Sequence, residues 1–153
     1  MWLQNSDMDK SKILELVKQK VSEKIQILEN LIAETRESNN DTKSSMGDKY
    51  ETSREMLQQE INNLQIQLNE NMKSLQILNS IQKNVHKTVG LGSFVQTEKG
   101  KFFIAVSLGE INFENQKIFI VSPESPLAKA MHGKSENDTF SLNNLNQEIQ
   151  KIW

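Results

Sequence analysis

The stretch YETSREMLQQEINNLQIQLNENMKSLQIL, residues 50–78, decides the fold of this chain. Positions along it recur at alternating intervals of four and three residues, and most of them are apolar. They are Tyr50, Arg54, Leu57, Ile61, Leu64, Leu68, Asn71, Leu75 and Leu78. A repeat of about 3.5 residues lines up such positions along one side of a helix that winds around another helix. The stretch therefore predicts a long helix that buries one narrow stripe against a partner helix.

A similar stripe runs through the residues before it. Its positions are Leu14, Val17, Val21, Lys24, Leu28 and Leu31, and Ile25 and Ile32 widen it. We expect Ser6 or Asp7 as the N-cap of this helix, and the polar residues 37–48, ESNNDTKSSMGD, as the loop after it. Two stripes of equal length joined by a short loop predict an antiparallel hairpin, with pairing to a second molecule as the alternative. Lys24 and Asn71 interrupt the stripes, and we interpret both as solvated or register-setting positions.

The composition changes near residue 88. Before it the chain contains no proline and a single glycine, Gly47, whereas all other glycines and both prolines follow. Apolar runs bounded by turn residues predict strands at 93–97, 101–106, 117–121, 139–142 and 145–153. Ser125 as N-cap, Pro126 at the first helical position and Gly133 as C-cap predict one short helix. We therefore expect an α+β protein with a coiled-coil hairpin over 1–88, its tip loop near 37–48, and a small α+β domain over 89–153.

Composition and charge exclude several classes of function. The chain has no cysteine, which excludes disulfides, thiolate zinc sites and a cysteine nucleophile. Its net charge of −2 argues against binding nucleic acid mainly through phosphate neutralisation. It has no apolar run long enough to cross a membrane, and its start lacks the pattern of a secretory signal. We therefore expect a cytoplasmic monomer with no membrane partner.

The sequence contains no motif that predicts catalysis by the chain alone. It has no P-loop, no GxGxxG and no defensible Ser-His-Asp arrangement. His86 and His132 each end a predicted helix, where the helix dipole favours a histidine. The sequence therefore predicts no catalytic site within the chain.

Three segments carry a resemblance to a known family. The segments IAETRES at 32–38 and KYETSRE at 49–55 resemble the coiled-coil tip of the Gre transcript-cleavage factors, the GreA/GreB type of transcription elongation factor. The segment SPESPLAKAMHGKSENDTFSL at 122–142 is similar to the SPLGRALLGK element of the same family and is more specific than the coiled coil. The resemblance covers nearly the whole chain, because the strands around this element follow in the family's order.

The resemblance implies a fold, a partner and a role. The fold is an N-terminal antiparallel coiled coil followed by an FKBP-like domain, and the partner is bacterial RNA polymerase. The coiled coil would enter the secondary channel of the polymerase, where two acidic tip residues help to hold a magnesium ion of the polymerase active site. Cleavage of backtracked RNA is then performed by the polymerase, and nascent RNA is met only indirectly. The resemblance thus implies that the chain itself is not an enzyme and has no cofactor of its own. The residues implied in partner binding are Ser125, Pro126, Leu127, Lys129 and Lys134.

The tip of this chain departs from the family pattern. Counting back from Tyr50 puts the family's two acidic positions at Lys43 and Met46, neither of which is acidic. Counting forward from Arg36 brings Asp41 within one residue of the first position. Asp41 and Asp48 are therefore the candidates for assisting catalysis and for contacting the polymerase-bound magnesium.

Three alternatives to a cleavage factor stay open. A Gre-like protein with displaced tip carboxylates could bind the channel and modulate or inhibit the polymerase without stimulating cleavage. The resemblance of the second part to FKBP domains makes a peptidyl-prolyl isomerase conceivable. A plain coiled-coil dimerisation module is the third alternative, and it predicts a dimer.

Overall fold

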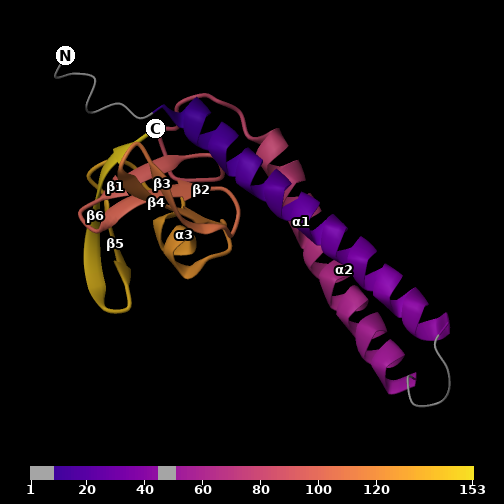
Figure 1. The fold of residues 1–153 in the computed structure, drawn as a ribbon. Helices are drawn as coiled ribbons and strands as arrows, with labels where there is room; N and C mark the ends of the chain where they lie inside the picture. The colour runs from indigo at the N-terminus through magenta and orange to yellow at the C-terminus, as the bar shows by residue number, and fades with distance from the viewer. Residues whose placement is uncertain (1–8, 45–50) are drawn as a thin grey trace. The chain divides into compact units, whose positions relative to one another are not determined.

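The structure of the protein is a computed structural model that describes residues 9–44 and 51–153, with side chains described for all of these except residues 41–44. The elements, in chain order, are α1 (Lys10–Ser44), α2 (Glu51–Ser80), β1 (Phe94–Thr97), β2 (Gly100–Ile104), β3 (Gly109–Phe113), β4 (Gln116–Val121), α3 (Pro126–Met131), β5 (Thr139–Leu142) and β6 (Leu145–Ile152) (Figure 1). Two long helices followed by a sheet domain confirm the expected α+β class.

Contacts within the chain divide it into two compact units. One unit is Gln19–Gln76, which is the larger part of both long helices. The other unit joins the start of α1, as far as Lys18, to Ile77–Trp153. This division is based on contacts between residues. The boundary between residues 88 and 89 is placed where the composition changes. That the chain folds as two independent domains on either side of it stays a prediction.

The hairpin unit is held by an apolar seam between α1 and α2. Its buried core consists of Leu28 and Ile32 from α1 and Ile61, Leu64 and Leu68 from α2, with Ile25 half-buried against it. Burying an aliphatic side chain of this size stabilises the folded state by about 1.5–3 kcal/mol. The two stripes therefore pack on each other within one chain, as the hairpin prediction requires.

The register of α2 is the predicted one. Among its seam positions Ile61, Leu64, Leu68 and Leu78 are buried. The remaining described positions, Arg54, Leu57, Asn71 and Leu75, are half-buried, and Tyr50 lies outside the described residues. Every described position that the 3.5-residue repeat selected on α2 therefore faces inward.

On α1 the predicted positions Leu14, Val17, Val21 and Leu28 are buried, and two others are displaced by one residue. Lys24 is exposed and Leu31 is 40% exposed, whereas Ile25 and Ile32 take the inward positions. The spacing accommodates both choices because apolar residues occupy neighbouring positions along this helix. Desolvation decides between them, since a seam through Lys24 would take an ammonium group out of water. Lys24 is therefore a solvated position, as interpreted, but it lies beside the seam and not in it.

Helix α1 is longer than the sequence indicates. It continues to Ser44, so residues 37–44 of the expected tip loop are helical, and α2 begins at Glu51. Asn, Asp, Thr and Ser each disfavour a helix by less than about 0.7 kcal/mol, and no proline or glycine precedes Gly47 to end it. Asn39 is buried in this extension. The rest of the expected loop, residues 45–48, lies outside the described residues.

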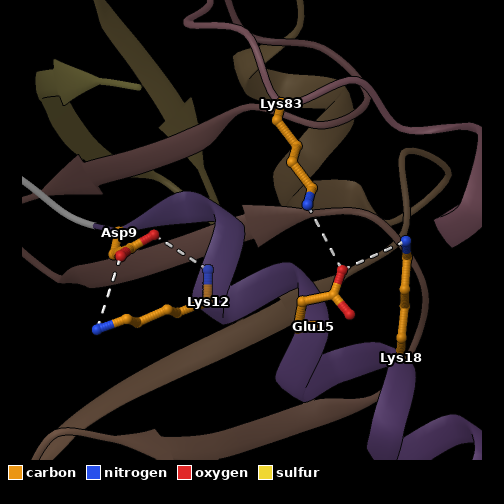
Figure 2. Close-up of polar contacts among 5 residues, drawn as sticks. All are labelled: Asp9, Lys12, Glu15, Lys18 and Lys83. Atoms are coloured by element: carbon orange, nitrogen blue, oxygen red, sulfur yellow. Dashed lines mark hydrogen bonds and ion pairs between the residues drawn. The ribbon is translucent and has the colours of Figure 1, made fainter.

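The start of α1 is capped by Asp9 (Figure 2). The Lys12 backbone N–H donates to Asp9 Oδ1 over 3.1 Å, and the Lys12 ammonium lies 3.9 Å from the other carboxylate oxygen. Glu15 pairs with Lys18 at 3.7 Å and with Lys83, from the segment after α2, at 3.6 Å. An Asp side chain that accepts from the third residue beyond it is an N-cap, and therefore Asp9 holds the place expected for Ser6 or Asp7. Both of those residues lie outside the described part of the chain.

The second unit is built on a six-stranded sheet in the order β3-β4-β2-β1-β6-β5. The β2–β4 pair is parallel, and the other four neighbouring pairs are antiparallel. One face packs against α3 through a buried core of Val89, Val95, Ile104, Ala128, Met131, Phe140, Ile149 and Ile152. The sequence correctly predicts these strands except β3, which contains a single buried residue, Ile111.

The start of α1 belongs to the same unit as the sheet, and Lys10 ties it there. The Lys10 ammonium donates to the main-chain oxygen of Asn84 at 2.7 Å and to that of Trp153 at 3.1 Å. Trp153 in turn packs edge-to-face on Phe94 at 5.3 Å between ring centres. Burial lowers the pKa of Lys10 from 10.5 to about 8. Burial, and then the nearby Lys10 charge, also lower the pKa of His86.

The stability of the protein should therefore rise with pH above the pKa of Lys10. Between about pH 8 and pH 10.5 the unfolded chain keeps the Lys10 proton while the folded chain releases it, so the free energy of unfolding increases. Relative to Lys10→Met, which cannot titrate, wild type should gain on the order of 2 kcal/mol across this range. Denaturant unfolding of both proteins below pH 8 and near pH 10.5 measures the gain. A difference between them that stays constant with pH would contradict the assignment.

The seam predicts a contrast between two neighbouring residues of α2. Leu64 is 7% exposed and Ile66 is 57% exposed. Leu64→Ala should lower the free energy of unfolding by about 2–3 kcal/mol, because it leaves a cavity in the seam. Ile66→Ala should change it by less than about 0.5 kcal/mol. Circular dichroism of the helices during urea unfolding compares the two, and equal losses would show that the seam is misplaced.

Candidate functional site

The short helix α3 is fixed at its start by Ser125. The Ala128 backbone N–H donates to Ser125 Oγ over 3.2 Å, and the Ser125 hydroxyl donates to the Ser122 carbonyl over 2.8 Å. The Lys129 N–H donates to the Ser125 carbonyl at 2.9 Å, which closes the first turn. Pro126 occupies the first turn, where its missing N–H costs nothing. The predicted N-cap and its proline are therefore confirmed.

The end of α3 is fixed by Gly133. This residue has a φ of +77°, in the left-handed region, and its N–H donates to the Val89 carbonyl at 2.9 Å. The Val89 N–H returns a bond to the Lys134 carbonyl at 2.9 Å. Glycine adopts this conformation without the steric cost of a side chain. The helix stops before Gly133 as predicted, although its C-cap residue is His132. The GK pair of the segment SPLAKAMHGK thereby anchors the end of the helix to the start of the domain.

Side chains of α3 divide into an inner and an outer set. Ala128 and Met131 are buried in the core of the domain, and Leu127 packs against that core while half-buried. Pro126 and Lys129 are exposed. Lys134 and Ser125 are half-buried. Ser125, Pro126, Leu127 and Lys129 thus lie at or on the short helix and Lys134 lies just after it, and Pro126 and Lys129 are open to solvent. The role of these five residues in partner binding stays a prediction.

The tip residues are placed only in part. Asp41 lies in the helical backbone of α1, and its side chain is not described. Asp48 lies outside the described residues. Over the described part of the chain, no three His, Cys, Asp or Glu residues gather where they could hold a metal ion. The proposed use of both aspartates therefore rests on the sequence alone.

A polar groove lies where the described parts of α1 and α2 approach the tip. We call it the Asn39 groove, and its lining residues are Asn39, Glu51, Arg54, Glu55 and Gln58. Asn39 is 7% exposed, and its Oδ1 has no hydrogen-bond donor among the described residues. Arg54 pairs with Glu51 at 3.6 Å, and the Gln58 amide donates to Asn62 Oδ1 at 3.1 Å.

Our sequence reasoning did not identify Asn39 as a candidate, although a signal for it exists. Asn39 lies one heptad beyond Ile32, so the seam continues through it once the register of α1 is corrected. The buried Lys10 left no such signal, because its burial depends on Asn84 and Trp153, which are distant in the sequence.

Comparisons with known proteins give solved structures alone. No family model matches the chain, and no curated protein matches it. The chain is similar to the transcription factor Gfh1 at 16% identity over 87% of this chain and 89% of that one, with a TM-score of 0.34. It is similar to GreA factor homolog 1 (Gfh1) of Thermus thermophilus at 18% identity over 93% of each chain, with a TM-score of 0.34. Thermus aquaticus Gfh1 is similar at 20% identity over 94% of each chain, with a TM-score of 0.32.

Likeness at this level does not assign the chain to a family.

Among the described helices, none is both long enough and apolar enough to cross a membrane.

The cap of α3 predicts a measurable contribution to stability. Ser125→Ala removes the acceptor for the Ala128 N–H and should lower the free energy of unfolding by about 1 kcal/mol. Ser107→Ala is the matched control, because Ser107 is exposed, and it should change stability by less than about 0.5 kcal/mol. Thermal unfolding followed through the near-ultraviolet signal of the domain compares them. Equal effects of the two changes would show that the Ser125 cap does not stabilise the domain.

Proposed function

We propose that this chain is a Gre-like transcription factor. It binds bacterial RNA polymerase, inserts the tip of its helical hairpin into the secondary channel and stimulates cleavage of backtracked RNA. The observation that carries the proposal is the pair of elements in one chain: a hairpin with a buried seam, and a domain whose short helix is built from SPLAKAMHGK. Their order in the chain is the one that the sequence resemblance implies.

The hairpin has physical properties that suit insertion into a narrow channel. Helix α2 has 30 residues, which gives a length of about 45 Å. Its buried apolar residues lie on the seam, whereas Met56, Ile66, Met72 and Ile77 are exposed. The outer face also carries short-range polar pairs such as Gln65 with Asn69 and Gln58 with Asn62. A two-helix rod of this kind is narrow, and most of its outer positions are polar.

In this proposal the chemistry belongs to the polymerase. Asp41 and Asp48 are the residues that would face the magnesium ion of the polymerase active site, which prefers carboxylate oxygens and water as ligands. The chain itself is then a non-enzymatic factor without a cofactor of its own, acting as a monomer in the cytoplasm. Light scattering of the purified protein tests the monomer, and nascent RNA would be met only through the polymerase.

One observation favours a second candidate function, in which the chain binds the channel and modulates the polymerase without cleavage. Helix α1 continues through Asp41 and Lys43 to Ser44, so Asp41, one of the two acids expected in the tip loop, belongs to a regular helix. Lys43 would repel a metal ion at close range, because like charges a few ångströms apart interact strongly in a water-poor site. Polymerase binding is common to both candidates, and transcript cleavage separates them.

The test is a cleavage assay on a stalled, backtracked polymerase complex. Wild-type protein should bind the polymerase and accelerate cleavage, and Asp41→Ala should reduce cleavage to the rate without factor while binding stays unchanged. Glu37→Gln is the matched control, since Glu37 is an exposed acid one turn earlier on α1, and it should behave as wild type.

Each outcome of this assay decides between the candidates. Binding without accelerated cleavage by the wild-type protein would establish the second candidate instead of the first. Full cleavage by Asp41→Ala would remove that residue from the role. Failure of the wild-type protein to bind polymerase would overturn the proposal as a whole.

A further inference from the structure

A hollow of about 400 Å³ lies beside the end of β6, within the unit that contains the sheet. Its lining residues are Val85, His86, Lys87, Ser135, Glu136 and Ile152. Backbone contacts hold the two loop segments of this lining together, since Thr88 forms a bridge with Ser135 and the Val89 N–H donates to the Lys134 carbonyl at 2.9 Å. The fold of the domain therefore fixes the walls of the hollow.

Two opposite charges line the hollow without neutralising each other. Lys87 and Glu136 are both exposed, and neither takes part in an ion pair with a described residue. Glu136 Oε1 accepts from the Ile152 N–H at 3.1 Å, which holds this carboxylate against β6. Its other oxygen and the Lys87 ammonium have no partner among the described residues. A ligand that carries both signs of charge is complementary to this pair.

The other polar side chains of the lining are also available. The Ser135 N–H donates to Asp138 Oδ2 at 2.8 Å, whereas its hydroxyl makes no hydrogen bond within the described part of the chain. The half-buried ring of His86 makes none there either. Burial, and then the Lys10 charge, lower the pKa of His86. The ring is therefore neutral at about pH 7, where it offers one donor and one acceptor.

Apolar surface completes the lining. Ile152 is 4% exposed and Val85 is 73% exposed. Covering an exposed valine with an apolar group is favourable, because it removes apolar surface from water. A hollow of this size that combines apolar surface with a few polar groups is typical of sites for small molecules.

We propose that this hollow binds a free α-amino acid with an apolar side chain. The ammonium and the carboxylate of such a molecule sit on one carbon, so they can meet Glu136 and Lys87 together. Its side chain covers Val85 and Ile152. An amine or a carboxylic acid alone would leave one of the two charges of the hollow without a partner. The inference concerns the sheet domain and goes beyond the proposed function, because it does not depend on polymerase binding.

The first experiment titrates L-leucine into the full-length protein. The backbone amide NMR signals of residues 85–87 and 135–136 should shift in a saturable way, with a dissociation constant on the order of 1 mM. N-acetyl-L-leucine amide, which has the same side chain without either charge, should give no saturable shift. No saturable shift with leucine, or an equal response to the neutral amide, would overturn the site.

Variants of the two charged residues test their roles. Lys87→Gln and Glu136→Gln should each weaken leucine binding by roughly tenfold. Glu136→Gln keeps the oxygen that accepts from Ile152, and Lys87 is exposed, so both variants should fold as wild type does. Lys99→Gln, a change of an exposed lysine outside the hollow, should bind leucine as wild type does. Unaltered leucine affinity in both hollow variants would overturn the inference.

Two fragments of leucine separate the two charges. Isocaproate lacks the ammonium, so its binding should weaken with Lys87→Gln and stay the same with Glu136→Gln. Isoamylamine lacks the carboxylate and should show the opposite pattern. The same NMR titration measures both fragments, and fragments that respond equally to the two variants would overturn the assignment of the charges.

Discussion

The dry contact between Leu28 and Ile32 of α1 and Ile61, Leu64 and Leu68 of α2 is the constraint on which the hairpin depends. Both helices are rich in Asn, Gln, Glu and Lys, and isolated helices in water are marginal when no packing supports them. Most of the surface of a helix pair faces solvent, so its stability must come from this one strip. The strip also sets the register, and through the register it decides which side chains near the tip face each other. Whatever the tip does, the seam determines how its helices present it.

The difference between α1 and α2 shows what limits prediction of such a seam. On α2, the seam positions Ile61, Leu64 and Leu68 have polar residues on both sides, so a single register satisfies the 3.5-residue repeat there. On α1, Lys24 stands beside Ile25 and Leu31 beside Ile32, and the spacing rule accepts either row. The structure selects the row that keeps the ammonium of Lys24 in water. The 3.5-residue repeat shows that the helix has one buried face. Which residues form that face also depends on the cost of removing each side chain from water. The sequence also failed to predict strand β3. The turn that joins it to β4, at Glu114 and Asn115 with φ of 50° and 65°, lacks the glycine that usually marks a hairpin.

Local features of the candidate site were predictable, and non-local ones were not. The caps of α3 depend on Ser125, Pro126 and Gly133, which lie within one short segment and act on backbone groups beside them. Lys10 acquires its lowered pKa from packing that joins Asn84 and Trp153 to the start of the chain, and no spacing rule records that meeting. Asn39 is intermediate. Its place on the seam follows from the sequence once the buried row of α1 is known. Only the structure shows that its oxygen has no partner, because Arg54 pairs with Glu51 and Gln58 donates to Asn62.

The seam between α1 and α2 ends near the tip in a polar residue, Asn39. If the helices needed nothing but stability, the aliphatic row through Ile25, Leu28 and Ile32 would extend to residue 39, because a leucine there adds burial at no electrostatic cost. Asparagine at that position weakens the seam where it approaches the tip, and the weakening is tolerated in a unit with few other buried contacts. Over the described residues no group compensates the amide oxygen, which is itself closed off from solvent. The two candidate functions differ in the chemistry of the tip and share the seam, so both fit the same fold.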